Sequence, residues 1–318
     1  MSPQDKKKQL KALIVKSITP LIDNDYVLLD LPYHSNLGDT LIWQGELDFL
    51  KAVPYKCLHS TWHGGNTSKS IKADTIILLH GGGNFGDVWP THQIFRKKII
   101  EKYPNNKVLI FPQTIYYSDN KKLEEDSAFF AEYPNVTICA RDEDSYQICK
   151  EFFSRNCSLL VPDMAFCMDM SKYSRVKQPK GDLFVRRTDL EINEKVDYSI
   201  VPKDVVESDW VWLEHSRDYY RRYMIENKFS RCDQFLGTDF KNLFNDLYWH
   251  HFLRELNVKT AIQFVDKYES IYTTRMHAAI LSVILGKKNV VLFDNSYGKS
   301  SSFYNTWLSD VDGLQLVK

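Results

Sequence analysis

Short apolar stretches alternate with segments of helical periodicity along most of the chain, and this alternation constrains the fold more than any other feature. In the first half, the expected strands are 26–32 (YVLLDLP), 55–60 (YKCLHS), 74–80 (DTIILLH), 107–113 (KVLIFPQ), 135–140 (NVTICA) and 157–163 (CSLLVPD). Helical stretches separate them, at 40–52, 91–102, 120–132 and 141–153. Strands spaced by helices predict a doubly wound, mostly parallel sheet.

A polar stretch at 171–181 (SKYSRVKQPKG) carries proline and glycine and is the expected linker between two domains. A second alternation follows it, with strands at 182–187, 270–275 and 289–294, an aromatic helical region from residue 216, and helices near 238–256, 276–286 and 301–309. We expect residues 1–170 and 171–318 to form two Rossmann-like α/β domains. The last helix is a candidate for packing back on the first domain.

The charge balance excludes a global electrostatic attraction to nucleic acid. Lysine plus arginine and aspartate plus glutamate number 41 each, so any anion site has to come from a local cluster. The six cysteines form no CxxC pair, no secretion signal is recognisable, and the longest apolar stretch, 278–285, is too short to span a bilayer. We expect a soluble, cytoplasmic protein.

The N-terminal residues 4–22 have the periodicity of an amphipathic helix. Leu10, Ile14 and Ile18 recur at helical spacing, and lysines line the other faces. Two interpretations stand: a helix packed on its own domain, and a basic helix that contacts the cytoplasmic face of the inner membrane.

Three consecutive glycines follow the strand at 74–80, in the stretch HGGGNFGDVW. If Gly81, Gly82 and Gly83 open a helix, their bare N–H groups let an anion or a sugar ring approach closely. The spacing is not the dinucleotide fingerprint GxGxxG, and the chain has no GxxxxGK[ST] phosphate loop. We therefore expect these glycines to lie against a bound substrate.

Polar clusters follow several strands of the first half, where open α/β sheets bind their ligands. The candidate binding residues there are Asn36, Gly38, Asn84, Gln113 and Arg141, together with the acids Asp39 and Asp87. Each cluster alone is ordinary turn chemistry. Their recurrence at one sheet edge favours a shared site. Carboxylates there suit an acceptor that carries hydroxyl groups, and they can act as general bases.

The second half supplies the cations. Arg275 and His277 lie in TTRMHAAI, between a strand and a helix, and a guanidinium with an imidazole there predicts an anion site with a proton donor. Arg186 and Arg187 end the strand 182–187, and strand alternation does not decide which of them faces a ligand. Lys299 is a candidate phosphate ligand or an ordinary loop lysine. No histidine or cysteine spacing indicates a metal site.

Several motifs together resemble the polysaccharide pyruvyl transferase family. They are NLGDT, GGGNFGDVW, PQT, RDEDS, DMAF and TTRMHAAI, and the closing DNSYGKSSSFYNTW is similar to members that modify bacterial exopolysaccharides or capsules. The motifs run from Asn36 to Trp307, and their order and number make the resemblance specific. The N-terminal helix and residues 188–257 contribute no matching motif.

The resemblance implies two Rossmann-like domains facing a cleft, as in GT-B glycosyltransferases, with the acceptor on the first domain and the donor on the second. It implies transfer of pyruvate from phosphoenolpyruvate to two hydroxyls of a sugar, as a cyclic ketal, with release of phosphate and no cofactor or metal. Arg275 and His277 match the family's Arg-x-His. Arg186 is the candidate for a second donor-binding arginine, with Arg187 as the alternative.

Roles follow as hypotheses. His277 is the acid or the proton donor to the leaving phosphate, and Arg275 is a donor clamp. Asp39 or Asp87 orients or deprotonates the acceptor. The acceptor sugar is a candidate for attachment to a lipid carrier. A GT-B glycosyltransferase that uses a nucleotide sugar is the nearest alternative. A carbohydrate- or anion-binding protein without catalysis is the other, but binding alone does not require the imidazole.

Overall fold

The computed structural model describes residues 1–65, 71–189, 191–210 and 238–318. These residues form two compact units. The first-sheet unit consists of Lys8–Pro32 and Ile42–Met168, and the second-sheet unit of Met1–Lys7, Tyr33–Leu41 and Asp169–Lys318. The helical region expected from residue 216 falls outside the described residues as far as position 237.

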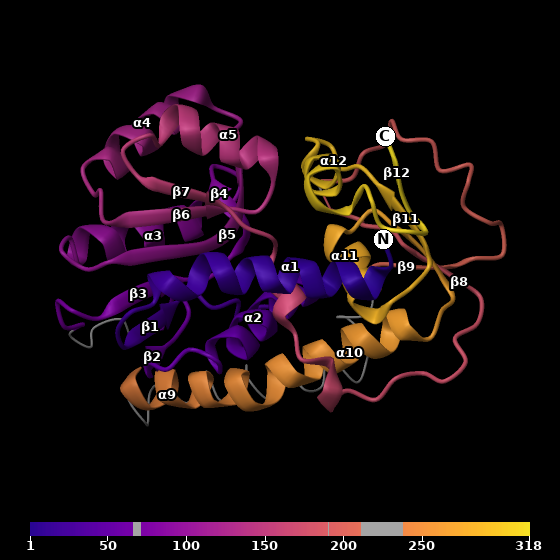
Figure 1. The fold of residues 1–318 in the computed structure, drawn as a ribbon, viewed down its shortest axis with the longest axis horizontal. Helices are drawn as coiled ribbons and strands as arrows, with labels where there is room; N and C mark the ends of the chain where they lie inside the picture. Colours follow the sequence, from indigo (N-terminus) through magenta and orange to yellow (C-terminus); the bar gives the residue numbers. More distant parts are fainter. Residues whose placement is uncertain (66–70, 190, 211–237) are drawn as a thin grey trace. The chain divides into compact units, whose positions relative to one another are not determined.

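The first-sheet unit contains a parallel sheet, which confirms the expected α/β class. Its described strands are β1 (Tyr26–Leu29), β2 (Cys57–Ser60), β3 (Ile76–Leu79), β4 (Gly82–Gly86), β5 (Val108–Tyr116), β6 (Val136–Ala140) and β7 (Cys157–Leu160). The order is β2-β1-β3-β5-β6-β7, with β4 paired to β5 (Figure 1). β2 lies beside β1 at one edge of the sheet, and the later strands β3, β5, β6 and β7 follow on the other side of β1. The order therefore reverses between β1 and β3, and ligands bind at such a point in open α/β sheets.

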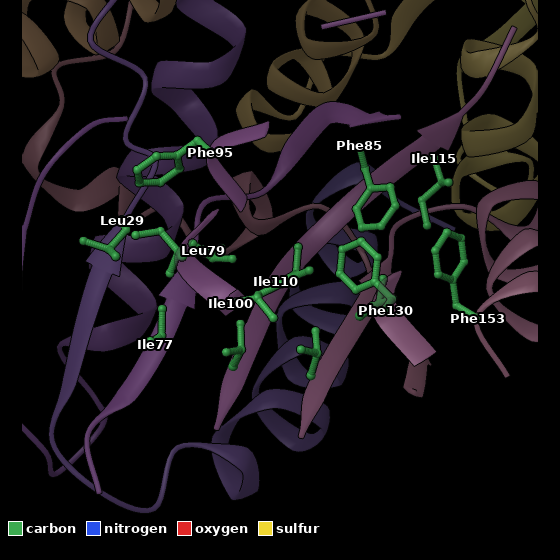
Figure 2. Close-up of a cluster of buried hydrophobic side chains, with 14 of the residues drawn as sticks. Leu29, Ile77, Leu79, Phe85, Phe95, Ile100, Ile110, Ile115, Phe130 and Phe153 are labelled. Carbon is green, nitrogen blue, oxygen red and sulfur yellow. The ribbon is translucent and has the colours of Figure 1, made fainter. Parts of the chain in front are cut away.

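Helices cover both faces of this sheet. They are α2 (Leu37–Leu50), α3 (Pro90–Lys102), α4 (Asn120–Ala131) and α5 (Glu143–Phe152). Ile77 and Ile110 on the strands belong to one buried cluster with Phe95 of α3 and Phe130 of α4 (Figure 2). Cys149 of α5 is part of the same cluster. On the opposite face, Phe49 of α2 meets the ring of Phe111 edge-on at 6.4 Å. The strands are apolar on both faces because both faces are covered.

The glycine segment differs from expectation, because it forms the strand β4 and α3 begins only at Pro90. Gly82 and Gly86 have φ of 127° and 124°, a region that favours glycine. A Cβ on Gly86 would lie 1.9 Å from the carbonyl oxygen of Tyr116, and one on Gly81 would lie 2.9 Å from that of Pro112. The close neighbour of these glycines is therefore the protein's own strand β5.

The N-terminal helix α1 (Pro3–Ile18) is followed by the short helix η1 (Thr19–Leu21). Leu10, Ile14 and Ile18 are buried, as a packed amphipathic helix requires. Lys6 is also buried and pairs with Asp310 at 2.6 Å. Within the described ranges, none of the helices has both the length and the apolar character needed to cross a bilayer. Contact with a membrane surface stays a prediction.

The second-sheet unit also contains a parallel sheet. Its described strands are β8 (Asp182–Val185), β9 (Val206–Ser208), β10 (Ser270–Thr273), β11 (Asn289–Phe293) and β12 (Leu314–Val317), in the order β12-β11-β10-β8-β9. Phe184, Val196, Val291 and Phe293 form a core on one face. The strands β8, β10 and β11 were expected from the sequence, whereas the edge strands β9 and β12 were not.

The helices of this unit include a long segment that continues beyond its expected end at 256. It comprises α9 (Thr238–Tyr248), a π-helical turn η4 (Trp249–Leu253) and α10 (Arg254–Asp266). The others are α11 (Met276–Leu285), α12 (Lys299–Phe303) and the π-helical turn η5 (Tyr304–Leu308). Two short 3-10 helices, η2 (Met164–Cys167) and η3 (Met170–Lys172), lie in the preceding part of the chain. α11 packs against β10 and β11, directly after the Arg-x-His motif.

Candidate functional site

The segment of residues 33–41, which ends in the first turn of α2, brings Gly38 against His277 within the second-sheet unit. A Cβ on Gly38 would lie 2.5 Å from Nδ1 of His277, so any larger residue would force the imidazole to shift. The amide Nδ2 of Asn36 donates to the carboxylate of Asp39 at 2.9 Å, and its Oδ1 accepts from the N–H of Gly38. Three residues predicted from the motif NLGDT therefore lie together with His277.

Arg275 stands at the N-cap of α11, where two carboxylates hold its guanidinium. Its Nε and Nη2 each donate to Asp209 at 2.8 Å, and its Nη1 lies 3.0 Å from Asp189. Asp209 is buried, whereas the side chain of Asp189 is 41% exposed. The buried carboxylate of Asp209 fixes the guanidinium with two hydrogen bonds, whereas the carboxylate of Asp189 is open to solvent.

The two arginines after β8 have different surroundings. Arg187 is buried, and its guanidinium binds Asp189 and Glu191, both at 2.7 Å. The side chain of Arg186 is 42% exposed, pairs with Glu207 at 3.3 Å and lies over the ring of Tyr198. Since Arg187 and Arg275 share Asp189, the structure brings Arg187 rather than Arg186 together with Arg275.

Lys299 adds a third cation, with its Nζ 3.9 Å from the carboxylate of Glu191. Burial would raise the pKa of Glu191, but the charges of Lys299 and Arg187 lower it to about 2. Burial acts in the same way on Asp189, and there Arg187 and Arg275 keep the pKa below its usual range. These carboxylates are therefore ionised at neutral pH, and the cluster is an alternating network of charges.

In the first-sheet unit, the polar residues at the strand ends are bound to one another. Gln113 is buried, donates to the carbonyl of His80 at 2.7 Å and accepts from the N–H of Asn84 at 3.2 Å. The N–H of Gly81 donates to Glu46, whose second oxygen lies 2.8 Å from Nδ1 of His80. The predicted binding residues Gln113, Asn84 and Gly81 thus hold the ends of β3 and β5 in place.

Asp87 and Arg141 have internal partners that fix loops. Asp87 accepts from the backbone N–H and the hydroxyl of Ser118 and from the N–H of Asp119. Burial would raise its pKa, but these hydrogen bonds lower it. Arg141 is fully buried, with Asp163 at 2.7 Å and the hydroxyl of Thr114 at 2.8 Å. Gly82 and Gly83 lie in β4, where the segment pairs with β5.

A further cluster was not predicted. Asp30 directly follows β1, and its Oδ1 lies 2.8 Å from Nδ1 of His92 and 3.6 Å from Nδ1 of His63. Arg96 links this carboxylate to the glycine segment, because its Nη2 lies 3.8 Å from Asp30 Oδ2 and donates to Asn84 at 2.7 Å. A signal was present, since His92 and Arg96 are four residues apart on the expected helix 91–102 and so share one face.

The comparisons with known proteins concern almost the whole chain. The family model for polysaccharide pyruvyl transferase matches residues 36–297. EpsO of Bacillus subtilis (strain 168), a candidate pyruvyl transferase, is 31% identical over 298 residues, which cover 93% of this chain and 89% of the relative. Pyruvyl transferase 1 of Schizosaccharomyces pombe is 28% identical over 312 residues, which cover 91% of this chain and 72% of the relative.

A crystal structure supports the fold. An uncharacterized protein from Klebsiella pneumoniae superposes with a TM-score of 0.66 at 19% identity, covering 97% of this chain and 98% of that chain. Because the family model spans both sheets and reaches from the NLGDT loop past the Arg-x-His motif, the chain belongs to the polysaccharide pyruvyl transferase family.

Proposed function

We propose that this protein transfers the pyruvyl group of phosphoenolpyruvate to two hydroxyls of a sugar in a polysaccharide precursor, forming a cyclic ketal and releasing phosphate. The observation that carries the proposal is the network that links Arg187, Arg275 and Lys299 through Asp189 and Glu191, just after the ends of β8, β10 and β11. His277 lies two residues after Arg275, at the start of α11. The family and the names of its relatives support pyruvyl transfer to a saccharide.

The cations suit the donor because phosphoenolpyruvate carries two anionic groups, a carboxylate and a phosphate. Guanidinium groups bind both bidentately. Arg275 is held by the buried Asp209 and keeps its orientation when the more exposed Asp189 gives way. We assign Arg275 and Arg187 to the donor's anionic groups and Lys299 to its phosphate.

His277 is suited to proton transfer. Its imidazole sits against Gly38 and is partly exposed, so it can reach a bound molecule. We assign it as the acid that protonates C3 of the donor or the departing phosphate. Asp39 and Asn36, in the same loop, orient an acceptor hydroxyl. Asp87 already accepts three hydrogen bonds at the start of α4, and we therefore give it a structural role.

The reaction balances without an added reagent. C3 of the enol gains a proton, and C2 takes up the oxygen of the first hydroxyl, which loses its proton. The bond from C2 to the phosphate oxygen then breaks, with its electron pair leaving on the phosphate. The second hydroxyl adds to C2 and gives its proton to the phosphate, which closes the ketal.

The test is phosphate release from phosphoenolpyruvate, with and without a panel of galactosyl, glucosyl and mannosyl acceptors. We expect release that depends on the acceptor and is lost in Arg275→Ala and His277→Ala. Arg186→Ala is the matched control, because it removes an arginine of the same unit that pairs with the exposed Glu207.

Two results would count against the proposal. One is the absence of release with every acceptor, together with thermal stabilisation by nucleotide sugars and none by phosphoenolpyruvate; this would favour a glycosyltransferase. The other is near-normal turnover in folded His277→Ala, since a positioned acid or base contributes about 10²–10⁴-fold.

A further inference from the structure

Three residues with metal-binding side chains meet where β1 ends, within the first-sheet unit. Asp30 follows β1, His63 follows β2, and His92 lies in the first turn of α3. The pairing of the first two strands continues past β2, because the N–H of Leu31 donates to the carbonyl of Thr61 at 3.2 Å, and this brings His63 beside Asp30. The three positions are far apart in the sequence, so they form no motif with metal-ligand spacing, and only the fold brings them together.

The spacing of the ligand atoms is close to that around a tetrahedral ion. Oδ1 of Asp30 lies 2.8 Å from Nδ1 of His92 and 3.6 Å from Nδ1 of His63. One ligand atom from each residue lies within 4.8 Å of those of the other two. Around zinc, with bonds of about 2.0–2.1 Å, tetrahedral ligand atoms lie about 3.3–3.4 Å apart. Small side-chain rotations would therefore complete the geometry.

Two buried polar atoms of the cluster have no hydrogen-bond partner among the described residues. They are Oδ2 of Asp30 and Nδ1 of His63. The 3.6 Å between Nδ1 of His63 and Asp30 is too long for a hydrogen bond. Native proteins rarely leave such atoms unpaired unless a water or an ion binds them. A hydrogen bond between Asp30 and His92 explains the position of His92, but it leaves the buried nitrogen of His63 without a partner.

The backbone and the exposure of the cluster also fit a binding site. Asp30 has φ of 66° and is the one non-glycine position among the described residues with positive φ. Such conformations cluster at functional sites. The side chains of His92 and His63 are 15% and 25% exposed, whereas that of Asp30 is fully buried. An ion can therefore enter from the side of the two imidazoles.

Arg96 lies behind the cluster. Its buried guanidinium donates to the amide oxygens of Gln93 at 2.5 Å and Asn84 at 2.7 Å. It is 3.8 Å from Oδ2 of Asp30, so it leaves Oδ1 free for an ion. Groups behind a metal ligand commonly fix its orientation. The positive charge of Arg96 opposes the binding of a cation, and we therefore expect moderate rather than very tight affinity.

We propose that Asp30, His63 and His92 bind a divalent transition metal ion, for which zinc is the probe. The ligands are Oδ1 of Asp30 and one nitrogen of each imidazole. Imidazole suits zinc and its neighbours in the first transition row, whereas magnesium and calcium prefer oxygen ligands. Three protein ligands leave one tetrahedral position for water or another oxygen ligand.

The inference goes beyond pyruvyl transfer and is independent of it. All three ligands and Arg96 belong to the first-sheet unit. The ion joins the end of β1, the segment after β2 and the start of α3. Because a ligand that binds only the folded state stabilises that state, zinc should make this unit more resistant to unfolding.

The experiment measures zinc binding to the full-length protein, purified without a histidine tag and treated with a chelator that is then removed. Isothermal calorimetry gives the stoichiometry and affinity, and circular dichroism checks the fold of each variant. The variants are His63→Ala, which breaks no hydrogen bond of Nδ1, and Asp30→Asn, since asparagine also tolerates positive φ. The matched control is His59→Ala, which removes a partly exposed histidine of β2 outside the cluster.

We expect one zinc ion per chain in the wild-type protein and in His59→Ala. His63→Ala and Asp30→Asn should bind zinc more than about 100-fold more weakly, because loss of a group behind the ligands already costs about 10–100-fold. Zinc should raise the midpoint of thermal unfolding of the wild-type protein and the control, and leave those of the two variants unchanged.

Three results would overturn the proposal. The first is that zinc, cobalt and nickel all fail to bind the wild-type protein stoichiometrically. The second is that folded His63→Ala and Asp30→Asn bind zinc within about threefold of the wild-type affinity, well short of the loss expected for a ligand. The third is an equal loss in His59→Ala, which would assign the zinc to β2 near the exposed Cys57. Each readout is independent of phosphate release, so failure of this proposal is distinguishable from failure of the proposed function.

Discussion

Replacement of Gly38 by alanine tests the contact between the NLGDT loop and His277. The added Cβ would lie 2.5 Å from Nδ1, 2.9 Å from Cγ and 3.1 Å from Cβ of His277, whereas ordinary contact begins near 3.4 Å. The imidazole therefore has to move by the difference between 3.4 and 2.5, which is about 0.9 Å. A displacement of about 1 Å at a reacting group can lower the rate by about 10²-fold.

Stability should not fall with activity in this variant. Gly38 lies in the first turn of α2 and has no positive φ, so alanine fits the backbone. We therefore expect Gly38→Ala to lose about 10²-fold in kcat for acceptor-dependent phosphate release, with an unchanged midpoint of urea unfolding. Gly45→Ala is the contrast, because its Cβ would lie 1.9 Å from the carbonyl oxygen of Met164 and has to disturb the backbone.

The assay pairs phosphate release with urea unfolding on the same preparations. Turnover of Gly38→Ala within twofold of the wild-type rate would show that the position of His277 does not limit the reaction. Loss of stability in parallel with the loss of kcat would assign Gly38 a folding role instead.

Three further predictions concern the charged groups. Arg187→Ala should raise the KM for phosphoenolpyruvate about 10–100-fold, as expected for loss of a charge-assisted hydrogen bond. Arg186→Ala should leave this KM nearly unchanged. Equal effects of the two substitutions in steady-state kinetics would refute the assignment of Arg187 rather than Arg186 to the donor. Asp189→Asn should lower the same KM by up to about fivefold, because the partly exposed carboxylate competes with the donor's anionic groups, and an increase would contradict this. The pKa of Asp30 is lowered from its usual 3.8 to about 2, so its charge stabilises the fold above pH 4 and this contribution disappears as the pH falls toward 2. Urea unfolding should show Asp30→Asn about 2 kcal/mol less stable at pH 6, with a difference that shrinks at low pH; a constant difference would count against the charged state.

The sequence predicts strands where an apolar run is covered on both faces. β1, β3, β5 and β6 were expected for this reason, since each is a continuous apolar run that ends at polar or turn residues. β4 was not expected, because three of the five residues in Gly82–Gly86 are glycine, which leaves no alternating pattern of side chains. The segment is a strand through its pairing with β5. The edge strands β9 and β12 are short and have partly exposed residues, so their patterns are weak.

The site was predictable only to the level of strand ends. The strand-end rule drew attention to Asn36, Gly38, Arg275 and His277, which the structure places in one unit. The rule did not distinguish side chains that face a ligand from side chains that point into the protein. Arg141, a predicted binding residue, is fully buried and paired with Asp163. The approach of Arg96 to Asp30 depends on helix packing, on which strand order gives no information.

The segment of residues 33–41, which includes the first turn of α2, has a consequence for protein engineering. Tyr33 stacks on Trp249 at 5.3 Å and donates to Asp246, and Thr40 lies 3.2 Å from the amide of Asn257, so the C-terminal helices hold the loop that touches His277. A hybrid enzyme made by joining residues 1–168 of one relative to residues 169–318 of another would pair a loop with helices that did not evolve together. Such exchanges should transfer residues 33–41 with the C-terminal part, so that the histidine keeps its own loop.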